Sequence, residues 1–148
     1  MRIIIISILV SGSIFAQGFL HNMDGEVVDG NGEPILLRGF GLGGWLVPEG
    51  YMLHNQAWIE GFESPTDIEN HVIDLIGQDE ANEFWELYRA NYVAQADIDK
   101  IAEWGFNHIR VPFHYKQFYD STGTETPIGY AIVDELITWC QPHNIYII

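Results

Sequence analysis

Short apolar strands that alternate with helices constrain this chain more than any other feature. Residues 35–42, 107–112 and 145–148 have the strand pattern. Apolar strands separated by helices are typical of parallel strands that are buried on both faces. The predicted order is a hairpin, a strand, a long helical insertion, a strand, a helix and a strand. This order predicts an α/β fold, and both a doubly wound sheet and a (β/α)8 barrel fit it.

Helix signals are clear at several points. Ser64 can cap a helix that has Pro65 in its first position, and Gly77 can end it. Apolar residues at helical spacing predict further helices around 84–88, around 98–105 and over 130–141. Asn144 can adopt the left-handed conformation that ends the last one. Residues 51–63 and 121–129 are expected to be irregular.

Residues 19–37 predict a β-hairpin. Its expected arms, 26–28 and 34–37, flank the turn at 29–32. Asp29 and Asn31 have the spacing of a calcium loop, but Pro34 stands where an EF-hand needs glycine. We therefore predict a turn at this position and no metal site in the chain.

The first 16 residues predict a secretory signal and hence a secreted protein. Arg2 precedes an apolar run, small polar residues follow, and Ala16 suits cleavage. The run is too short for a transmembrane helix, and no other segment is expected to span a membrane.

The formal net charge of −15 excludes several classes of partner. It disfavours nucleic acids, anionic membranes and anionic polysaccharides, whereas a neutral sugar is not repelled. Cys140 is the only cysteine, so no internal disulfide can form, and its apolar surroundings predict a core residue.

Residues 39–44 fit the G-x-G-x-x-G pattern of dinucleotide sites. Such a site needs a helix directly after the glycines, because the helix N-terminus holds the pyrophosphate. Pro48 and Gly50 disrupt a helix there. We therefore predict no nucleotide at these glycines.

Several motifs together resemble the glycoside hydrolases of family 5. LRGFGLGGWLVPE (37–49) is similar to the first barrel strand of the subgroup that contains exo-β-1,3-glucanases, and GFNHIRVP (105–112) resembles the second strand. Residues 96–102 look like the first barrel helix, while 132–139 and 144–148 resemble the second helix and the third strand. The resemblance implies that residues 17–148 are the N-terminal portion of a catalytic (β/α)8 barrel. That portion would hold about three of the eight strands, follow a hairpin and end within strand three.

Arg110 is the main candidate for a role in the chemistry. In a strand, Ile109 and Val111 share one face, while His108 and Arg110 share the other, which would point into the barrel. Active sites of such barrels lie at the C-terminal ends of the strands, and a buried guanidinium needs a carboxylate partner. The resemblance implies that Arg110 hydrogen-bonds the catalytic nucleophile, a glutamate. The alternative is structural pairing with another acid.

Four further residues are candidates for substrate binding. The resemblance implies that Glu49 and Tyr51, after the first strand, line a sugar pocket, and His114 and Tyr115 could reach the same rim. A carboxylate accepts hydrogen bonds from sugar hydroxyls, and aromatic rings pack on sugar faces. The alternatives are a solvated acid and ordinary loop packing. Trp45 and Trp58 fit sugar platforms or core positions equally, and we assign no ligand role to His21, His54, His71 and His143.

The resemblance implies retaining hydrolysis of O-glycosidic bonds in β-glucan-type polysaccharides by double displacement, with no cofactor. It places the two catalytic glutamates after strands four and seven, so no catalytic glutamate is expected within residues 1–148. We expect these residues alone to be inactive and poorly folded. A secreted carbohydrate-binding barrel without catalysis is the second hypothesis, and an unrelated barrel enzyme is the third.

Overall fold

The computed structural model describes residues 18–53 and 64–148. The predicted secretory signal, His54 and Trp58 lie outside the described residues. The chain divides into two units, Met1–Leu36 and Leu37–Ile148. Among the described residues, no helix has the length and apolar character needed to cross a bilayer.

The first unit contains an antiparallel pair of strands, β1 (His21–Met23) and β2 (Glu26–Val28). Asp24 and Gly25 connect them with φ angles of 52° and 89°. A type I′ turn requires positive φ at both central residues, and its twist matches that of the strands. The predicted arm at 26–28 is confirmed, but its main partner is β1 and not residues 34–37.

The predicted turn at 29–32 is also confirmed. Asp29 Oδ1 accepts hydrogen bonds from the backbone N–H groups of Asn31 (2.8 Å) and Glu33 (3.0 Å). These bonds lower the pKa of the Asp29 carboxyl group. The predicted arm at 34–37 contributes an isolated bridge from Pro34 to Val28 in place of a regular strand. The carboxylate that resembled a calcium ligand is therefore part of the turn.

In the second unit, local chemistry sets the ends of helix α2 as predicted. Ser64 Oγ accepts the backbone N–H of Asp67 at 3.2 Å, and the Asp67 carboxylate accepts the N–H of Ser64 at 3.1 Å. This reciprocal capping box satisfies donors that the first helical turn leaves free. Pro65 is the first helical residue, and Gly77, with φ of 88°, ends the helix by donating its N–H to the carbonyl of Ile73.

Two helical boundaries differ from the prediction. Helix α5 begins at Pro127, three residues before the expected start at 130, because proline in the first position is pre-organised for a helix. A short helix, α1, begins at Gly50, a residue expected to disrupt a helix, and continues over residues 51–53, a region expected to be irregular. Asn144 has φ of 54°, which confirms the predicted left-handed end after α5. The helices are α1 (Gly50–Leu53), α2 (Pro65–Ile76), α3 (Gln78–Tyr92), α4 (Gln95–Glu103) and α5 (Pro127–Cys140), with 3-10 turns η1 (Tyr115–Gln117) and η2 (Gln141–His143).

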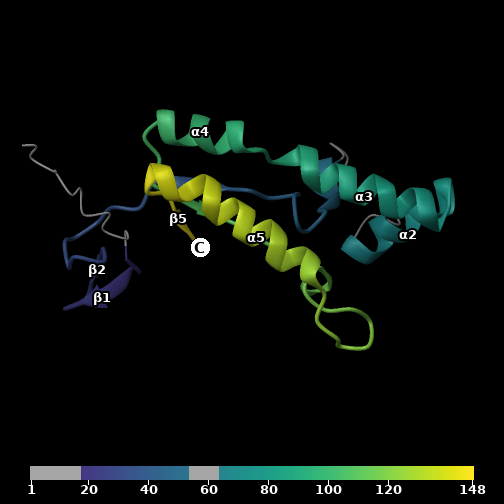
Figure 1. Ribbon diagram of the computed structural model, residues 1–148, viewed down its shortest axis with the longest axis horizontal. Helices are drawn as coiled ribbons and strands as arrows, with labels where there is room; N and C mark the ends of the chain where they lie inside the picture. The colour runs from purple at the N-terminus through teal and green to yellow at the C-terminus, as the bar shows by residue number, and fades with distance from the viewer. Residues whose placement is uncertain (1–17, 54–63) are drawn as a thin grey trace, which may run out of the picture. The chain divides into compact units, whose positions relative to one another are not determined.

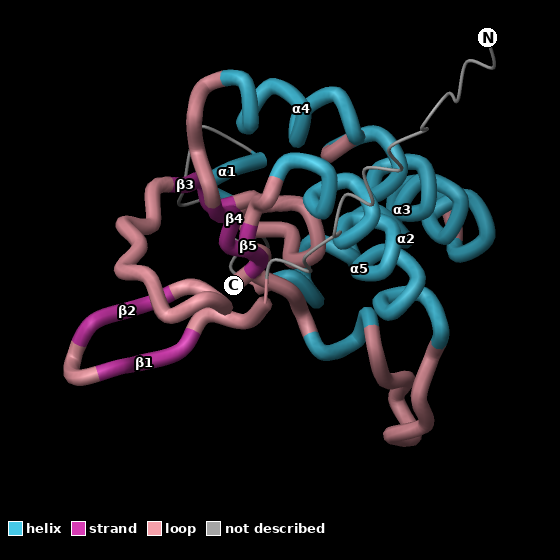
Figure 2. The backbone as a smooth tube through the Cα atoms, turned by 60° about the vertical axis from the view of Figure 1, so that its left-hand side comes forward, coloured by secondary structure: helices cyan, strands magenta, loops and turns pink. Residues whose placement is uncertain are grey.

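The second unit contains a parallel sheet in the order β3–β4–β5, and Figure 2 shows the three strands side by side. Its strands are shorter than the apolar segments predicted for them. Phe40 pairs with Ile109, which in turn pairs with Ile147, and Gly41 pairs with Arg110. The strands are β3 (Gly39–Gly41), β4 (His108–Arg110) and β5 (Tyr146–Ile147).

The core lies between one face of this sheet and helices α4 and α5, which pack on each other (Figure 1). Ile109 of β4, Ile98 of α4 and Leu136 of α5 are completely buried. Leu46, from the loop after β3, is completely buried in the same cluster. The apolar spacing that predicted these elements therefore identifies the residues that hold them together.

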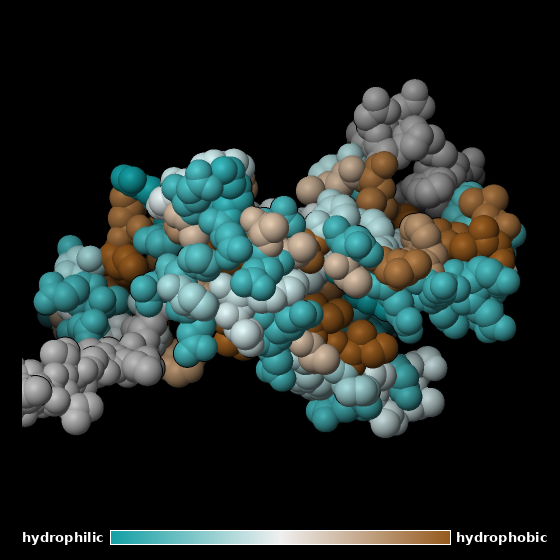
Figure 3. All heavy atoms as spheres, turned by 45° about the horizontal axis from the view of Figure 1, so that its top comes forward, coloured by the Kyte–Doolittle hydropathy of each residue, from teal (hydrophilic) through white to brown (hydrophobic). Residues whose placement is uncertain are grey.

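Large apolar side chains also reach the surface, where those of phenylalanine and the aliphatic residues appear brown in Figure 3. Phe40 on the edge strand β3 is 39% exposed and packs edge-on against Phe106, with ring centroids 4.6 Å apart. Trp104 is 58% exposed and lies beside the ring of Phe40. An edge strand with exposed apolar neighbours is a surface on which further chain can pair.

Leu136 and Ile137 provide a test of this core on a single helix. Leu136→Ala should lower the free energy of unfolding of the full-length protein by about 2–5 kcal/mol, because it leaves a cavity among buried residues. Ile137 is 47% exposed, so Ile137→Ala should change the free energy of unfolding by only about 0.5 kcal/mol. Denaturant titration measures both values. Equal effects would contradict the packing of α5 described above.

Candidate functional site

The segments that follow β3 and β4 run side by side at the C-terminal edge of the sheet. The N–H of Leu42 donates to the carbonyl of Arg110 at 2.8 Å, and the N–H of His114 donates to the carbonyl of Leu46 at 3.0 Å. Leu46 and Phe113 form a parallel bridge between these hydrogen bonds. The two loops that carry the sequence candidates are thus fixed to each other by backbone pairing.

Glu49 and Tyr51 form a pair after β3. The Tyr51 hydroxyl donates to Glu49 Oε1 at 3.3 Å, and Tyr51 is 61% exposed. The negative charge of Glu49 is the main cause of a raised pKa of Tyr51, while the positive charge of Arg110 acts in the opposite direction. Arg110 therefore lies near enough to this pair to influence its ionisation.

Gly43 packs closely against two side chains, Met52 and Glu49. A Cβ atom placed on Gly43 would come within 2.8 Å of the Met52 side chain and 3.5 Å of the Glu49 carboxylate. The Met52 atoms are the far end of a flexible side chain, so a small residue at Gly43 favours this packing without being indispensable for it.

His114 and Tyr115 form a second pair, after β4. Their rings lie 4.6 Å apart between centroids and are tilted by 35°. His114 Nδ1 is 3.3 Å from the backbone N–H of Lys116, and Tyr115 is 60% exposed. An exposed aromatic ring beside an imidazole can offer both an apolar face and a hydrogen bond.

Arg110 is exposed in the described part of the chain. The carboxylate partner expected for it would come from a later strand, so its burial in a complete barrel stays a prediction. Arg110 forms no ion pair with any carboxylate of residues 18–53 and 64–148. The reason is the alternation of the strand: Ile109 faces the helices, whereas Arg110 points to the opposite face. There Arg110 neighbours Gly41, where an added Cβ would meet nothing within 4 Å.

His108 shares this face with Arg110, as predicted from strand alternation. Its Nδ1 atom is buried and has no hydrogen-bond partner in the described part of the chain. A Cβ on Gly39 would collide with the His108 backbone and come within 2.6 Å of Nδ1. Gly39 is thus needed for the close approach of β3 to β4 at this point.

The remaining residues considered in the sequence lie either in the core or in contacts away from the two pairs. Trp45 is 3% exposed and donates its indole N–H to the carbonyl of Arg89 at 2.8 Å, so it is a core residue and not a sugar platform. Cys140 is buried, which raises its pKa to about 11 and confirms its assignment to the core. His143 pairs with Asp99 at 2.7 Å. Among the described residues, no group of three or more side chains is arranged to hold a metal ion.

The structure therefore brings the sequence candidates together as two pairs on neighbouring loops, and Arg110 lies near the Glu49–Tyr51 pair. Sequence reasoning missed Lys116, whose side chain reaches Glu69 and Thr66 of α2. These residues lie 47 and 50 positions from Lys116 in the sequence. No local pattern indicates a contact over that separation.

Comparison with known proteins decides the family. Residues 60–148, more than half of the chain, match the model described as cellulase (glycosyl hydrolase family 5). This chain belongs to the cellulase family, glycosyl hydrolase family 5. The family implies a (β/α)8 barrel, and the parallel three-stranded sheet with its helices is consistent with part of one.

Individual relatives carry several glycosidase names. This family 5 chain is 31% identical to a β-xylosidase of Phanerodontia chrysosporium over 124 residues, which are 82% of the chain and 25% of the relative. It is 25% identical over 114 residues to a probable glucan 1,3-β-glucosidase A of Aspergillus niger, covering 76% and 27%. Endoglucanase C of Acetivibrio thermocellus is 34% identical over 56 residues, covering 36% and 16%. The chain thus spans about a quarter of the length of the first two relatives.

The Glu49–Tyr51 pair provides a titration test of the site. Glu49→Gln should lower the pKa of Tyr51 toward its ordinary value, because the nearby negative charge no longer opposes loss of the phenolic proton. A ¹³C NMR titration of the tyrosine rings measures the shift. Asp134→Asn, at an exposed position on α5, is the control that removes one charge elsewhere. A Tyr51 pKa that responds equally to both variants would contradict the pairing.

Proposed function

We propose that the full-length protein is a secreted retaining glycoside hydrolase that acts on β-glucan-type polysaccharides. Its catalytic barrel would start at residue 17 and would take about three of its eight strands from residues 17–148. The relatives include glucan 1,3-β-glucosidases and endoglucanases. Family membership supports the class of reaction, and the choice of a β-glucan as substrate is our proposal.

One observation carries this proposal. In a family 5 chain, the side chains that suit sugar binding lie on adjacent loops at the C-terminal edge of parallel strands, where barrel enzymes have their active sites. The Glu49 carboxylate can accept hydrogen bonds from two sugar hydroxyls. The exposed rings of Tyr51 and Tyr115 can pack against the apolar faces of sugar rings, and His114 adds a polar contact.

Arg110 is proposed to support the nucleophile. Its exposed guanidinium is on the sheet face away from α4 and α5, which would become the barrel interior. A glutamate supplied by a later strand could accept two parallel hydrogen bonds from it. These bonds would hold the carboxylate ionised and aligned for attack on the anomeric carbon, with no metal or cofactor.

Double displacement needs two carboxyl groups about 5–5.5 Å apart, one as nucleophile and one as acid and base. We assign neither role to Glu49, whose partner in the structure is the Tyr51 hydroxyl. We therefore expect residues 1–148 alone to release no sugar from β-glucans in a reducing-end assay. Hydrolysis by this segment would contradict the assignment of the catalytic glutamates to later strands.

The main test offers the full-length protein a panel of neutral substrates: β-1,3-, β-1,4- and mixed-linkage glucans, and xylan. Release of reducing ends from a glucan supports the proposal, and NMR of the first product should show the β-anomer, as retention requires. Binding of glucan without hydrolysis would favour a non-catalytic carbohydrate-binding barrel. Cleavage of xylan alone would overturn the choice of substrate.

Arg110 gives the sharpest single-residue test. Arg110→Met should lower kcat of the full-length protein by about 10–100-fold, because one charge-assisted interaction with the nucleophile is lost. Arg38→Met is the matched control, since Arg38 is exposed and precedes β3 at the opposite end of the strand. Equal loss in both variants, or none in Arg110→Met, would contradict the role of Arg110.

A further inference from the structure

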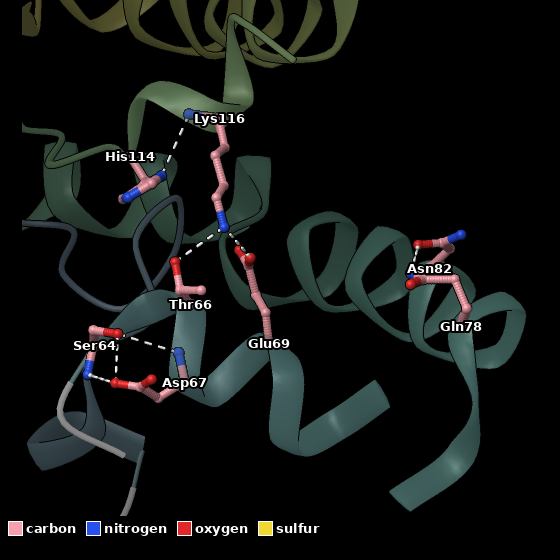
Figure 4. A network of polar contacts seen from close by, with 8 residues as sticks. All are labelled: Ser64, Thr66, Asp67, Glu69, Gln78, Asn82, His114 and Lys116. Carbon is pink, nitrogen blue, oxygen red and sulfur yellow. Dashed lines mark hydrogen bonds and ion pairs between the residues drawn. The ribbon is translucent and has the colours of Figure 1, made fainter. Parts of the chain in front are cut away.

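Lys116 connects the loop after β4 to helix α2. It belongs to η1, directly after His114 and Tyr115. Its Nζ atom lies 2.9 Å from Glu69 Oε2 and 3.0 Å from Thr66 Oγ1, as Figure 4 shows. Thr66 and Glu69 are three residues apart on α2, so their side chains lie on the same side of the helix. We call these three residues the Lys116 clamp.

The clamp is more protected from solvent than an ordinary surface ion pair. Side-chain exposure is 35% for Lys116 and 25% for Glu69, against 49% and 67% for the Lys100–Glu103 pair on α4. Exposed ion pairs contribute little because water and salt screen them. The clamp is less exposed and adds a third partner, Thr66. Lys100 and Glu103, by contrast, are three residues apart on one helix and join no separate segments.

Helix α2 provides a firm support for the clamp. Its first turn, which includes Thr66, is held by the capping box, and Ser64 Oγ also donates to the Asp67 carboxylate at 2.6 Å. Figure 4 shows this cap next to the clamp. The helix also packs along α3. Lys116 is therefore attached to a helix whose start is fixed independently of the β4 loop.

The backbone of Lys116 acts on His114. The Lys116 N–H lies 3.3 Å from His114 Nδ1. A backbone N–H can only donate, so Nδ1 must accept, and the proton of the neutral ring is then on Nε2. His114 is also held through its own N–H, which donates to the carbonyl of Leu46. The ring consequently presents Nε2–H as a hydrogen-bond donor.

We propose that the Lys116 clamp is a positioning device for sugar binding. By holding η1 against α2, it keeps the Lys116 N–H on His114 Nδ1 and so fixes the tautomer that offers Nε2–H to a sugar hydroxyl oxygen. Lys116 itself does not touch the sugar. This inference rests on the proposed function only in taking a neutral glucan as the ligand.

The test uses Lys116→Met and Glu69→Gln in the full-length protein, because both keep most of the side-chain volume and remove one charge. Each should raise KM for the glucan roughly fivefold, as expected for loss of one neutral hydrogen bond, with kcat within about twofold. The double variant should be no worse than either single variant, since both break the same contact. Lys116→Arg, which keeps the charge, should recover most of the loss.

A second readout follows the histidine directly. In ¹⁵N NMR spectra, with the signal assigned by His114→Gln, His114 should be the Nε2–H tautomer in the parent chain and a mixture of tautomers in Lys116→Met. Lys100→Met is the matched control, because it breaks an ion pair that does not reach the loop. It should leave both the tautomer and KM unchanged.

These outcomes separate the clamp from the proposed function. An unchanged His114 tautomer in Lys116→Met, or the same KM change in Lys100→Met, would overturn the clamp. A full-length protein that cleaves none of the substrates would overturn the proposed function, while the tautomer measurement would still decide whether Lys116 positions His114. A loss of kcat without a change of KM would assign the clamp to the reaction step and contradict a role in binding.

Discussion

The parallel pairing of β3 with β4 is the constraint on which the site depends. Its register places Gly39 opposite His108 and Gly41 opposite Arg110. Because side chains alternate along a strand, this register buries Ile109 against the helices and leaves Arg110 on the other face. A shift by one residue would exchange these two, exposing the centre of the core and burying an unpaired guanidinium.

The same pairing brings two loops together at one edge of the sheet. Backbone hydrogen bonds continue beyond the strands, from Leu42 to Arg110 and from His114 to Leu46. Leu46 is completely buried, so the loop after β3 is anchored in the core while it supports the loop after β4. The side chains proposed for sugar binding therefore rest on backbone that the core holds in place. Within β3, Gly39 permits the close approach of this strand to β4, because an added Cβ would collide with the backbone of His108.

Local chemistry explains why so much of the fold could be predicted. The Ser64 cap, the glycine after α2 and the left-handed Asn144 each act within a few residues of their position, and each is confirmed. The Asp24-Gly25 turn has an equally local sequence signal. The prediction paired the arm at 26–28 with residues 34–37 and did not use that signal. Apolar spacing identified Ile109 as facing the helices, because a strand or helix must bury its apolar side whatever the details of packing.

The sequence by itself thus determined the alternation of strands and helices, the faces of β4 and the family of the chain, since these follow from local patterns and short motifs. Only the tertiary structure decided that Arg110 is exposed, that Trp45 belongs to the core and that Lys116 reaches Glu69. Each of these depends on which distant segments come together in space. The sequence around a charged or aromatic residue does not indicate which distant residue folding places beside it.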